Sequence, residues 1–246
     1  VLSATGPTGA LPGPSGRSGT AAATGIPVTP GAVYRLSETG GPLTYVQVGA
    51  WQCRTDTGTT VAVTAAGDIT PASGVAITCT VTNSTASITL LEQIQRPQAG
   101  FQASDWRVTA TPAALAAGTL PTESRLGAEY SAAGNPASTF TVRPGHSYTL
   151  SEAATDPNRR LAYQELRLEQ LVGSAWVTVS SRTITAPAAG QTAVYRFVNA
   201  PVEPTRLPLT GGTSTDAFLI GGGLTLTLAF GLLLWHSRRR MRGAFR

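Results

Sequence analysis

The stretches TPGAVYRLSE (residues 29–38) and RPGHSYTLSE (residues 143–152) lie 114 residues apart and share one pattern. Each begins with a Pro-Gly dipeptide, which is typical of a turn. The turn leads into an alternating run that places Tyr, Leu and Glu on one face and the residues between them on the other. A side-chain period of two belongs to β-strands, so both stretches are predicted to be strands that follow a turn.

The rest of the chain up to residue 200 repeats at similar spacing. The further matches are YVQVGAWQC (45–53) with YQELRLEQL (163–171), CTVTN (79–83) with YRFVN (195–199), and the opening LSATGP with VTATP from Val108. Short strands rich in Thr and Val, separated by Gly and Pro turns, favour an all-β fold. We therefore expect two tandem Ig-like or prealbumin-like β-sandwich domains, residues 1–84 and 85–201, the first lacking its initial strand.

The chain has 246 residues and a formal net charge of +5, and its basic residues are all Arg. Five of the eighteen Arg follow residue 237, which leaves thirteen Arg and thirteen acidic residues before it. A protein that binds nucleic acid needs a basic face that follows the phosphates. The balanced body has no such excess of charge, so we expect no nucleic-acid partner.

Residues 217–235, AFLIGGGLTLTLAFGLLLW, form a run of nineteen uncharged and mostly apolar residues. As a helix the run would be about 28 Å long, which matches the hydrocarbon core of a bilayer. Arg238, Arg239 and Arg240 follow, and a positive flank marks the cytoplasmic side. We therefore predict a C-terminal transmembrane helix, an Arg-rich cytoplasmic tail at 236–246 and an extracellular body. The alternative, a buried core helix, would need a much larger surrounding domain.

The linker at 202–216 contains the pentapeptide LPLTG, formed by Leu207, Pro208, Leu209, Thr210 and Gly211. Followed by the apolar run and the Arg cluster, this motif resembles the cell-wall sorting signal of Gram-positive, in particular actinobacterial, surface proteins. The resemblance implies that a sortase cuts between Thr210 and Gly211 and joins Thr210 to peptidoglycan. It also implies a single-pass membrane precursor whose mature form lies in the cell wall, on the extracellular face. A chance LPLTG ahead of an ordinary anchor is the alternative.

The YxLSE pattern and the terminal FVN resemble the pilin-type and collagen-adhesin B-type sandwich domains of wall-anchored surface proteins. The resemblance covers residues 1–200 and implies a stalk or a pilus shaft. In many such domains a first-strand Lys forms an isopeptide bond with a terminal Asn, assisted by a Glu. By this resemblance Glu38 and Glu152 match the Glu, while Asn83 and Asn199 match the Asn.

The Lys that this resemblance implies is absent from the second domain. In ASITLLEQI (86–94) the alternation places Glu92 on the core face, at the position of the Lys. We therefore expect no crosslink there, and we expect Glu92, Glu152 and Asn199 to converge with one carboxyl group protonated near neutral pH. Alternatively, Glu92 turns outward at a strand end. The corresponding Lys of the first domain would precede Val1.

The two Cys residues, Cys53 and Cys79, fall on strands that the repeat treats as neighbours. Since an exported protein meets oxidising conditions, we predict a disulfide between them. Two free buried thiols are the alternative. The alignment places Leu171 and Tyr195 at the matching positions of the second domain, which predicts an apolar contact there.

Other chemistry is scarce in this sequence. Glu165 and Glu169 could suggest a paired-carboxylate site, but we interpret them as solvated charges on a strand face. His146 and His236 lie far apart, so local spacing assembles neither a metal site nor a Cys/His nucleophile pair. We expect no catalytic residue, no metal and no cofactor.

Together these features predict a sortase-anchored surface protein rather than an enzyme. The tandem sandwiches would form a wall-proximal stalk for an upstream adhesin or pilus-base region. Because the chain opens with VLSATGPTG and no Met, this expectation includes a region before Val1 that would contact a host or surface ligand. The alternative is the stalk and anchor of a surface hydrolase whose catalytic domain lies upstream.

Overall fold

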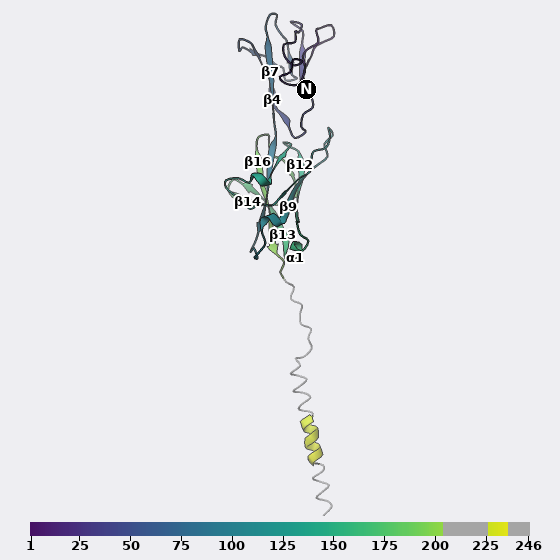
Figure 1. The fold of residues 1–246 in the computed structure, drawn as a ribbon, viewed down its shortest axis with the longest axis vertical. Helices are drawn as coiled ribbons and strands as arrows, with labels where there is room; N and C mark the ends of the chain where they lie inside the picture. Colours follow the sequence, from purple (N-terminus) through teal and green to yellow (C-terminus); the bar gives the residue numbers. More distant parts are fainter. Residues whose placement is uncertain (204–225, 236–246) are drawn as a thin grey trace, which may run out of the picture. The chain divides into compact units, whose positions relative to one another are not determined.

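Strands dominate the computed structural model, which describes residues 1–203 and 226–235 (Figure 1). Strands β1 to β16 lie in the first of these ranges. The same range contains two short 3₁₀ helices, η1 (Ala103–Asp105) and η2 (Pro136–Ser138), and one short α-helix, α1 (Arg159–Ala162). The all-β class predicted from the alternating pattern is therefore confirmed for the described residues.

The N-terminal strands form two sheets that enclose a small core, here called the N-terminal sandwich. One sheet has the order β2-β1-β3-β6, from Ser15–Gly16, Leu2–Thr5, Tyr34–Glu38 and Asp68–Ile69. The other has the order β5-β4-β7, from Thr60–Val61, Val46–Thr55 and Ile77–Ser84. Tyr34 and Leu36 of the first sheet pack with Cys53 of the second, because the inward side chains of facing sheets meet between them.

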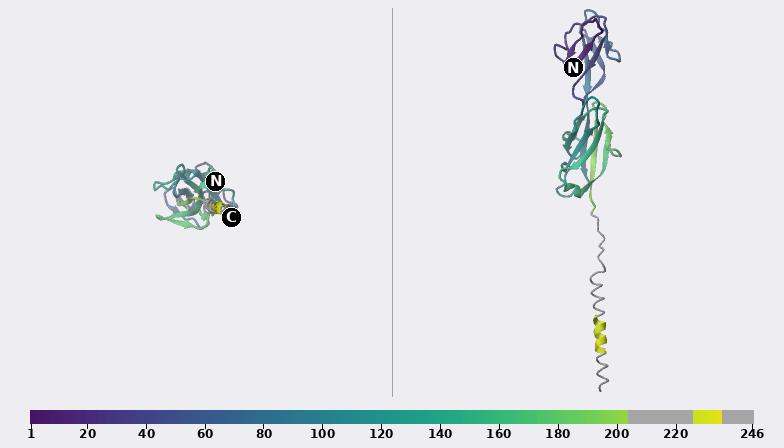
Figure 2. Two further views of the ribbon diagram at one scale, coloured as in Figure 1. Left: turned by 90° about the horizontal axis from the view of Figure 1, so that it is seen from below. Right: turned by 90° about the vertical axis from the view of Figure 1, so that its right-hand side faces the viewer.

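Strands β8 to β16 form the C-terminal sandwich, which Figure 2 shows from two further sides. Its smaller sheet has the order β10-β9-β12-β15, from Glu123–Leu126, Trp106–Pro112, Ser147–Ala154 and Thr183–Thr185. Its larger sheet has the order β11-β8-β16-β13-β14, from Thr139–Val142, Ala86–Ile94, Thr192–Pro201, Tyr163–Val172 and Ala175–Val179. Leu150 of one sheet packs with Leu90 and Phe197 of the other, and burying each side chain contributes about 2 kcal/mol.

The two sandwiches share strand order and register. Leu2 lies opposite Glu38 in the first, as Val108 lies opposite Glu152 in the second. The sheet β5-β4-β7 corresponds to β14-β13-β16, and the strand order therefore lacks counterparts of β8 and β11 among the described residues. The internal repeat read from the sequence is thus visible in the hydrogen-bonded pairing of the strands.

Residues Val1–Val202 form one compact unit, and the helix at 226–235 belongs to a second. The sheets and cores change at Thr85, but the division into domains 1–84 and 85–201 stays a prediction. Among residues 1–203 and 226–235, no helix combines the length and the apolar character that crossing a membrane requires. The predicted span is described only in its last part, and the sorting motif and the Arg tail lie outside the described residues.

Candidate functional site

The structure brings Glu92, Glu152 and Asn199 together between the sheets of the C-terminal sandwich. Strand β8 runs parallel to β16, which places Glu92 beside Phe197, two residues before Asn199 on β16. Glu152 comes from β12 in the facing sheet. The Asn199 amide nitrogen donates to Glu92 Oε1 at 2.6 Å and to Glu152 Oε2 at 2.9 Å. Three strands from two sheets therefore build this acid pair around one amide.

Burial decides the charge of the acid pair. Glu92 and Asn199 are fully buried, and neither Glu92 Oε2 nor Asn199 Oδ1 has a hydrogen-bond partner. Burial, followed by the hydrogen bond and the charge of Glu152, raises the pKa of Glu92 to about 11. Burial also raises the pKa of Glu152, although the hydrogen bond from Glu92 opposes that rise. Glu92 is therefore the carboxyl group of the pair that holds a proton at neutral pH.

A loop covers the Glu92 side of the acid pair. The Glu92 backbone nitrogen donates to Ala128 O at 2.9 Å. A Cβ added at Gly127 would lie 2.8 Å from Glu92 Cβ and 2.6 Å from Ala103 O, so the loop backbone lies directly against the Glu92 side chain. Nearby, Arg182 Nη2 donates to Glu165 Oε2 at the surface. The covered Glu92 carboxyl group can therefore hold a proton away from solvent.

The N-terminal sandwich holds the corresponding pair in the open. Asn83 Nδ2 donates to Glu38 Oε2 at 2.7 Å, and both side chains are exposed. They line a groove of about 550 Å³ together with the segment 40–47 and Arg143. The same two residue types thus meet in both sandwiches, and in the second sandwich Glu92 adds a second carboxyl group.

The disulfide is present between Cys53 and Cys79, which lie directly opposite each other on β4 and β7. This prediction is confirmed. The predicted contact between Leu171 and Tyr195 is wrong in register, because Tyr195 lies opposite Gln170. Strand β4 is irregular in its pairing with β7, and β13 is irregular in its pairing with β16. The irregularity of β4 covers more residues than that of β13, so the sequence alignment of the two strands is shifted by one position beyond it.

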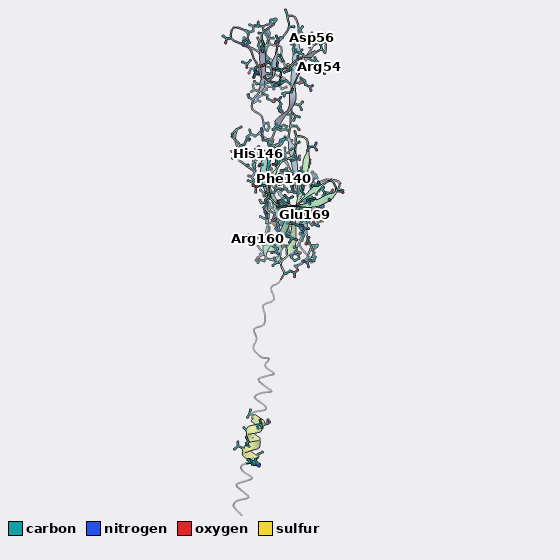
Figure 3. All side chains as sticks on the ribbon, turned by 180° about the vertical axis from the view of Figure 1, so that it is seen from behind. Arg54, Asp56, Phe140, His146, Arg160 and Glu169 are labelled. Atoms are coloured by element: carbon teal, nitrogen blue, oxygen red, sulfur yellow. A yellow bond between two sulfur atoms is a disulfide. The ribbon has the colours of Figure 1, made fainter. Side chains whose placement is uncertain are left out.

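The interpretation of Glu169 as a solvated charge is also wrong. Glu169, labelled in Figure 3, is 5% exposed. It accepts hydrogen bonds from Arg167 Nε and Arg196 Nε, each at 2.6 Å. Burial works to raise the pKa of Glu169, but the two Arg residues outweigh it and lower the pKa. The Arg196 guanidinium also lies 3.9 Å from the centre of the Trp176 ring, which covers the network.

Comparison with known proteins gives the fold of the first sandwich. Residues 1–81 match the family described as the SpaA-type prealbumin-like fold domain. They are similar to that domain. The match agrees with the prealbumin-like fold and with the pilin-type resemblance of the YxLSE pattern, for that part of the chain. No curated protein matches the chain.

Solved structures of pilus proteins share only a low overall similarity with the chain. The major pilin from Streptococcus pyogenes is 10% identical, with a TM-score of 0.29 over 70% of this chain and 69% of the pilin. The pilus adhesin SpaC from Lactobacillus rhamnosus GG, in its open conformation, is 16% identical, with a TM-score of 0.34 over 75% of this chain and 26% of the adhesin.

Proposed function

We propose that the chain is the wall-proximal stalk and anchor of a Gram-positive surface protein, joined to peptidoglycan by a sortase through Thr210. The observation that carries the proposal is the order of three features in the sequence: LPLTG, nineteen uncharged residues and an Arg cluster. The prealbumin-like fold of residues 1–81 supports it, because that family is the one in which the YxLSE resemblance places the chain.

The described part of the predicted span supports a membrane-held precursor. Residues 226–235 are helical and would extend about 15 Å at 1.5 Å per residue. Their large apolar side chains are exposed on every side of the helix: Leu226, Leu228, Phe230, Leu232, Leu233, Leu234 and Trp235. A helix that is apolar all round needs an apolar environment, and a bilayer supplies one.

The two sandwiches suit a mechanical role. In one the disulfide joins β4 to β7, and in the other a buried acid pair joins the two sheets. Neither feature needs a ligand. The partners of the chain would be the sortase, the membrane before processing and peptidoglycan after it, while a region preceding Val1, an adhesin or a pilus base, would contact a host or surface ligand.

Sorting is tested by expressing the chain, with a secretion signal, in a sortase-bearing Gram-positive host. Muramidase-released material should contain a form that ends at Thr210 and carries a wall peptide. Thr210→Ala should abolish this form because the acyl donor is lost. Leu209→Ala is the matched control, since it changes the variable position of the motif, and it should still be anchored. Wall-released protein that retains Gly211 or later residues in mass spectrometry would refute the proposal.

A further inference from the structure

Strand β14 is an edge of the larger sheet in the C-terminal sandwich. It pairs with β13 on one side, and no described residue hydrogen-bonds its backbone on the other. The pair Val172–Ala175 closes a two-residue turn, so alternation along the strands directs the backbone groups of Trp176 and Thr178 away from β13. These backbone groups can receive a further strand.

The sequence of β14 does not protect this edge. Natural edge strands are usually kept from pairing by charged side chains, Pro or a covering segment. Strand β14 contains neither a charged residue nor Pro, and Ala175, Val177 and Thr178 are exposed. By contrast β10, an edge of the smaller sheet, contains Glu123 and Arg125. The β14 edge is therefore suited to a partner strand.

Two Arg side chains lie on the outer face of the sheet, close to this edge. Arg196 comes from β16, yet its guanidinium carbon lies 3.9 Å from the centre of the Trp176 ring, which belongs to β14. The two side chains therefore meet above β13, the strand between them. Arg167 of β13 joins them through Glu169, the carboxylate that both Arg residues share.

The outer ends of both Arg side chains can bind a further acceptor. Glu169 accepts from the Nε atoms, and no described residue accepts from the Nη atoms of Arg167 or Arg196. The Arg167 side chain is 32% exposed and that of Arg196 is 17% exposed. Two guanidinium groups against one carboxylate leave the cluster with a net positive charge. Because a guanidinium group binds a carboxylate through paired N–H donors, the cluster suits a second carboxylate.

We propose that the β14 edge binds an extended acidic peptide segment of a partner protein. The segment adds a strand beside Trp176 and Thr178, and a Glu or Asp side chain on its outer face reaches the Nη atoms of Arg167 and Arg196. A second copy of this chain fits poorly, because two β14 strands paired edge to edge would place two positive clusters on one sheet face. The inference does not depend on sortase anchoring.

The probe is a short synthetic peptide in which Val and Glu alternate, and its control peptide has Gln in place of Glu. The full chain is studied in uncharged detergent micelles. At saturation the Glu peptide should slow hydrogen exchange of the Trp176 and Thr178 amides by about tenfold or more, and it should leave β11, the opposite edge, unchanged. The Gln peptide should bind about tenfold more weakly, because it lacks the charged acceptor.

Arg167→Gln and Arg196→Gln should each weaken binding of the Glu peptide by about tenfold and leave that of the Gln peptide unchanged. Arg125→Gln is the matched control, because it removes one positive charge from the smaller sheet, and it should leave both affinities unchanged. Equal affinity for the two peptides, or an equal loss in Arg125→Gln, overturns the proposal. Exchange at Trp176 and Thr178 that slows with protein concentration but not with peptide overturns it as well, because a second copy would then occupy the edge.

Discussion

Glu92 is a carboxyl group in the core of a sandwich, and its proton links folding to pH. The pKa of Glu92 is raised from its ordinary 4.5 to about 11, mainly by burial. The native state therefore keeps a proton that the unfolded chain releases. The stability from this proton is fully present below about pH 4.5 and is lost progressively as pH rises toward about 11. The raised pKa of Glu152 acts in the same direction.

Replacing Glu92 with Gln should remove most of this pH dependence. The amide keeps the shape of the protonated carboxyl group and cannot ionise, so Glu92→Gln should be as stable as the parent near pH 5 and more stable near pH 9. Denaturant unfolding at several pH values measures the difference. Glu123→Gln, at a partly exposed carboxyl group on β10, is the control and should follow the parent. If the unfolding free energies of the parent and of Glu92→Gln changed in parallel with pH, the prediction that Glu92 holds a proton in the folded state would be wrong.

A second change at the same position tests the absence of a crosslink. Apart from the hydrogens lost in the Cys53–Cys79 disulfide, the parent chain should have its unmodified mass, because no Lys lies beside Asn199. Glu92→Lys introduces an amine where Glu92 Oε1 now accepts from Asn199, and the resemblance to isopeptide-forming domains predicts that the amine attacks the Asn199 side-chain carbonyl and releases ammonia. Intact-mass analysis should show the loss of one ammonia. Adding Glu152→Ala to this variant should prevent the loss of ammonia. An unmodified mass for Glu92→Lys alone would contradict the prediction that the new amine can react with the Asn199 side chain.

At the scale of single elements, the disulfide joins two strands of a small core. The N-terminal sandwich buries few residues, so it should depend on the bond more than a larger core would. Replacing Cys53 and Cys79 together by Ala should lower its unfolding free energy by about 3 kcal/mol, the chain-entropy value for a loop of this size. Hydrogen exchange should quicken in β3 and β4 and stay unchanged in β9 and β12. An equal change in both sandwiches would argue that they unfold as one.

The alternating pattern and the internal repeat were sufficient to predict the strands around β3 and β12. Together with the family resemblance they also predicted that Glu92, Glu152 and Asn199 converge. They were insufficient where the outcome depends on residues from other strands. Glu169 looks solvated in its own strand, but Arg196 and Trp176 from neighbouring strands cover it. The residue predicted to lie opposite Tyr195 was wrong, because an irregular strand contains extra residues that a sequence alignment cannot place. Local pattern predicts strands well, and it predicts neighbours across a sheet only where the register is regular.

At the scale of the compact unit Val1–Val202, Arg143 and Leu43 join the two sandwiches. Arg143 Nη1 donates to Leu43 O at 2.6 Å and to Tyr45 O at 3.1 Å. The Leu43 side chain packs against the core of the C-terminal sandwich, so an apolar contact and a charged donor act on the same segment. The counterpart of Arg143 in the repeat is Thr29, which is too short to make such a contact. A link of this kind stiffens the unit, because two sandwiches that are held together cannot reorient independently.

Arg143→Ala should therefore loosen the link without unfolding either sandwich. The two carbonyl oxygens lose a charged donor but can accept from water, so we expect a small loss of stability, within about 1 kcal/mol. The larger effect should be on motion. In ¹⁵N relaxation of the segment Val1–Val202, both sandwiches of the parent should share one rotational correlation time, whereas in Arg143→Ala each should tumble with its own, shorter time. Arg125→Ala, which removes an exposed Arg paired with Glu123 within one sandwich, should retain the shared time. A single correlation time in Arg143→Ala would assign the stiffness to Leu43 instead, and Leu43→Ala would then be the variant that separates the two motions.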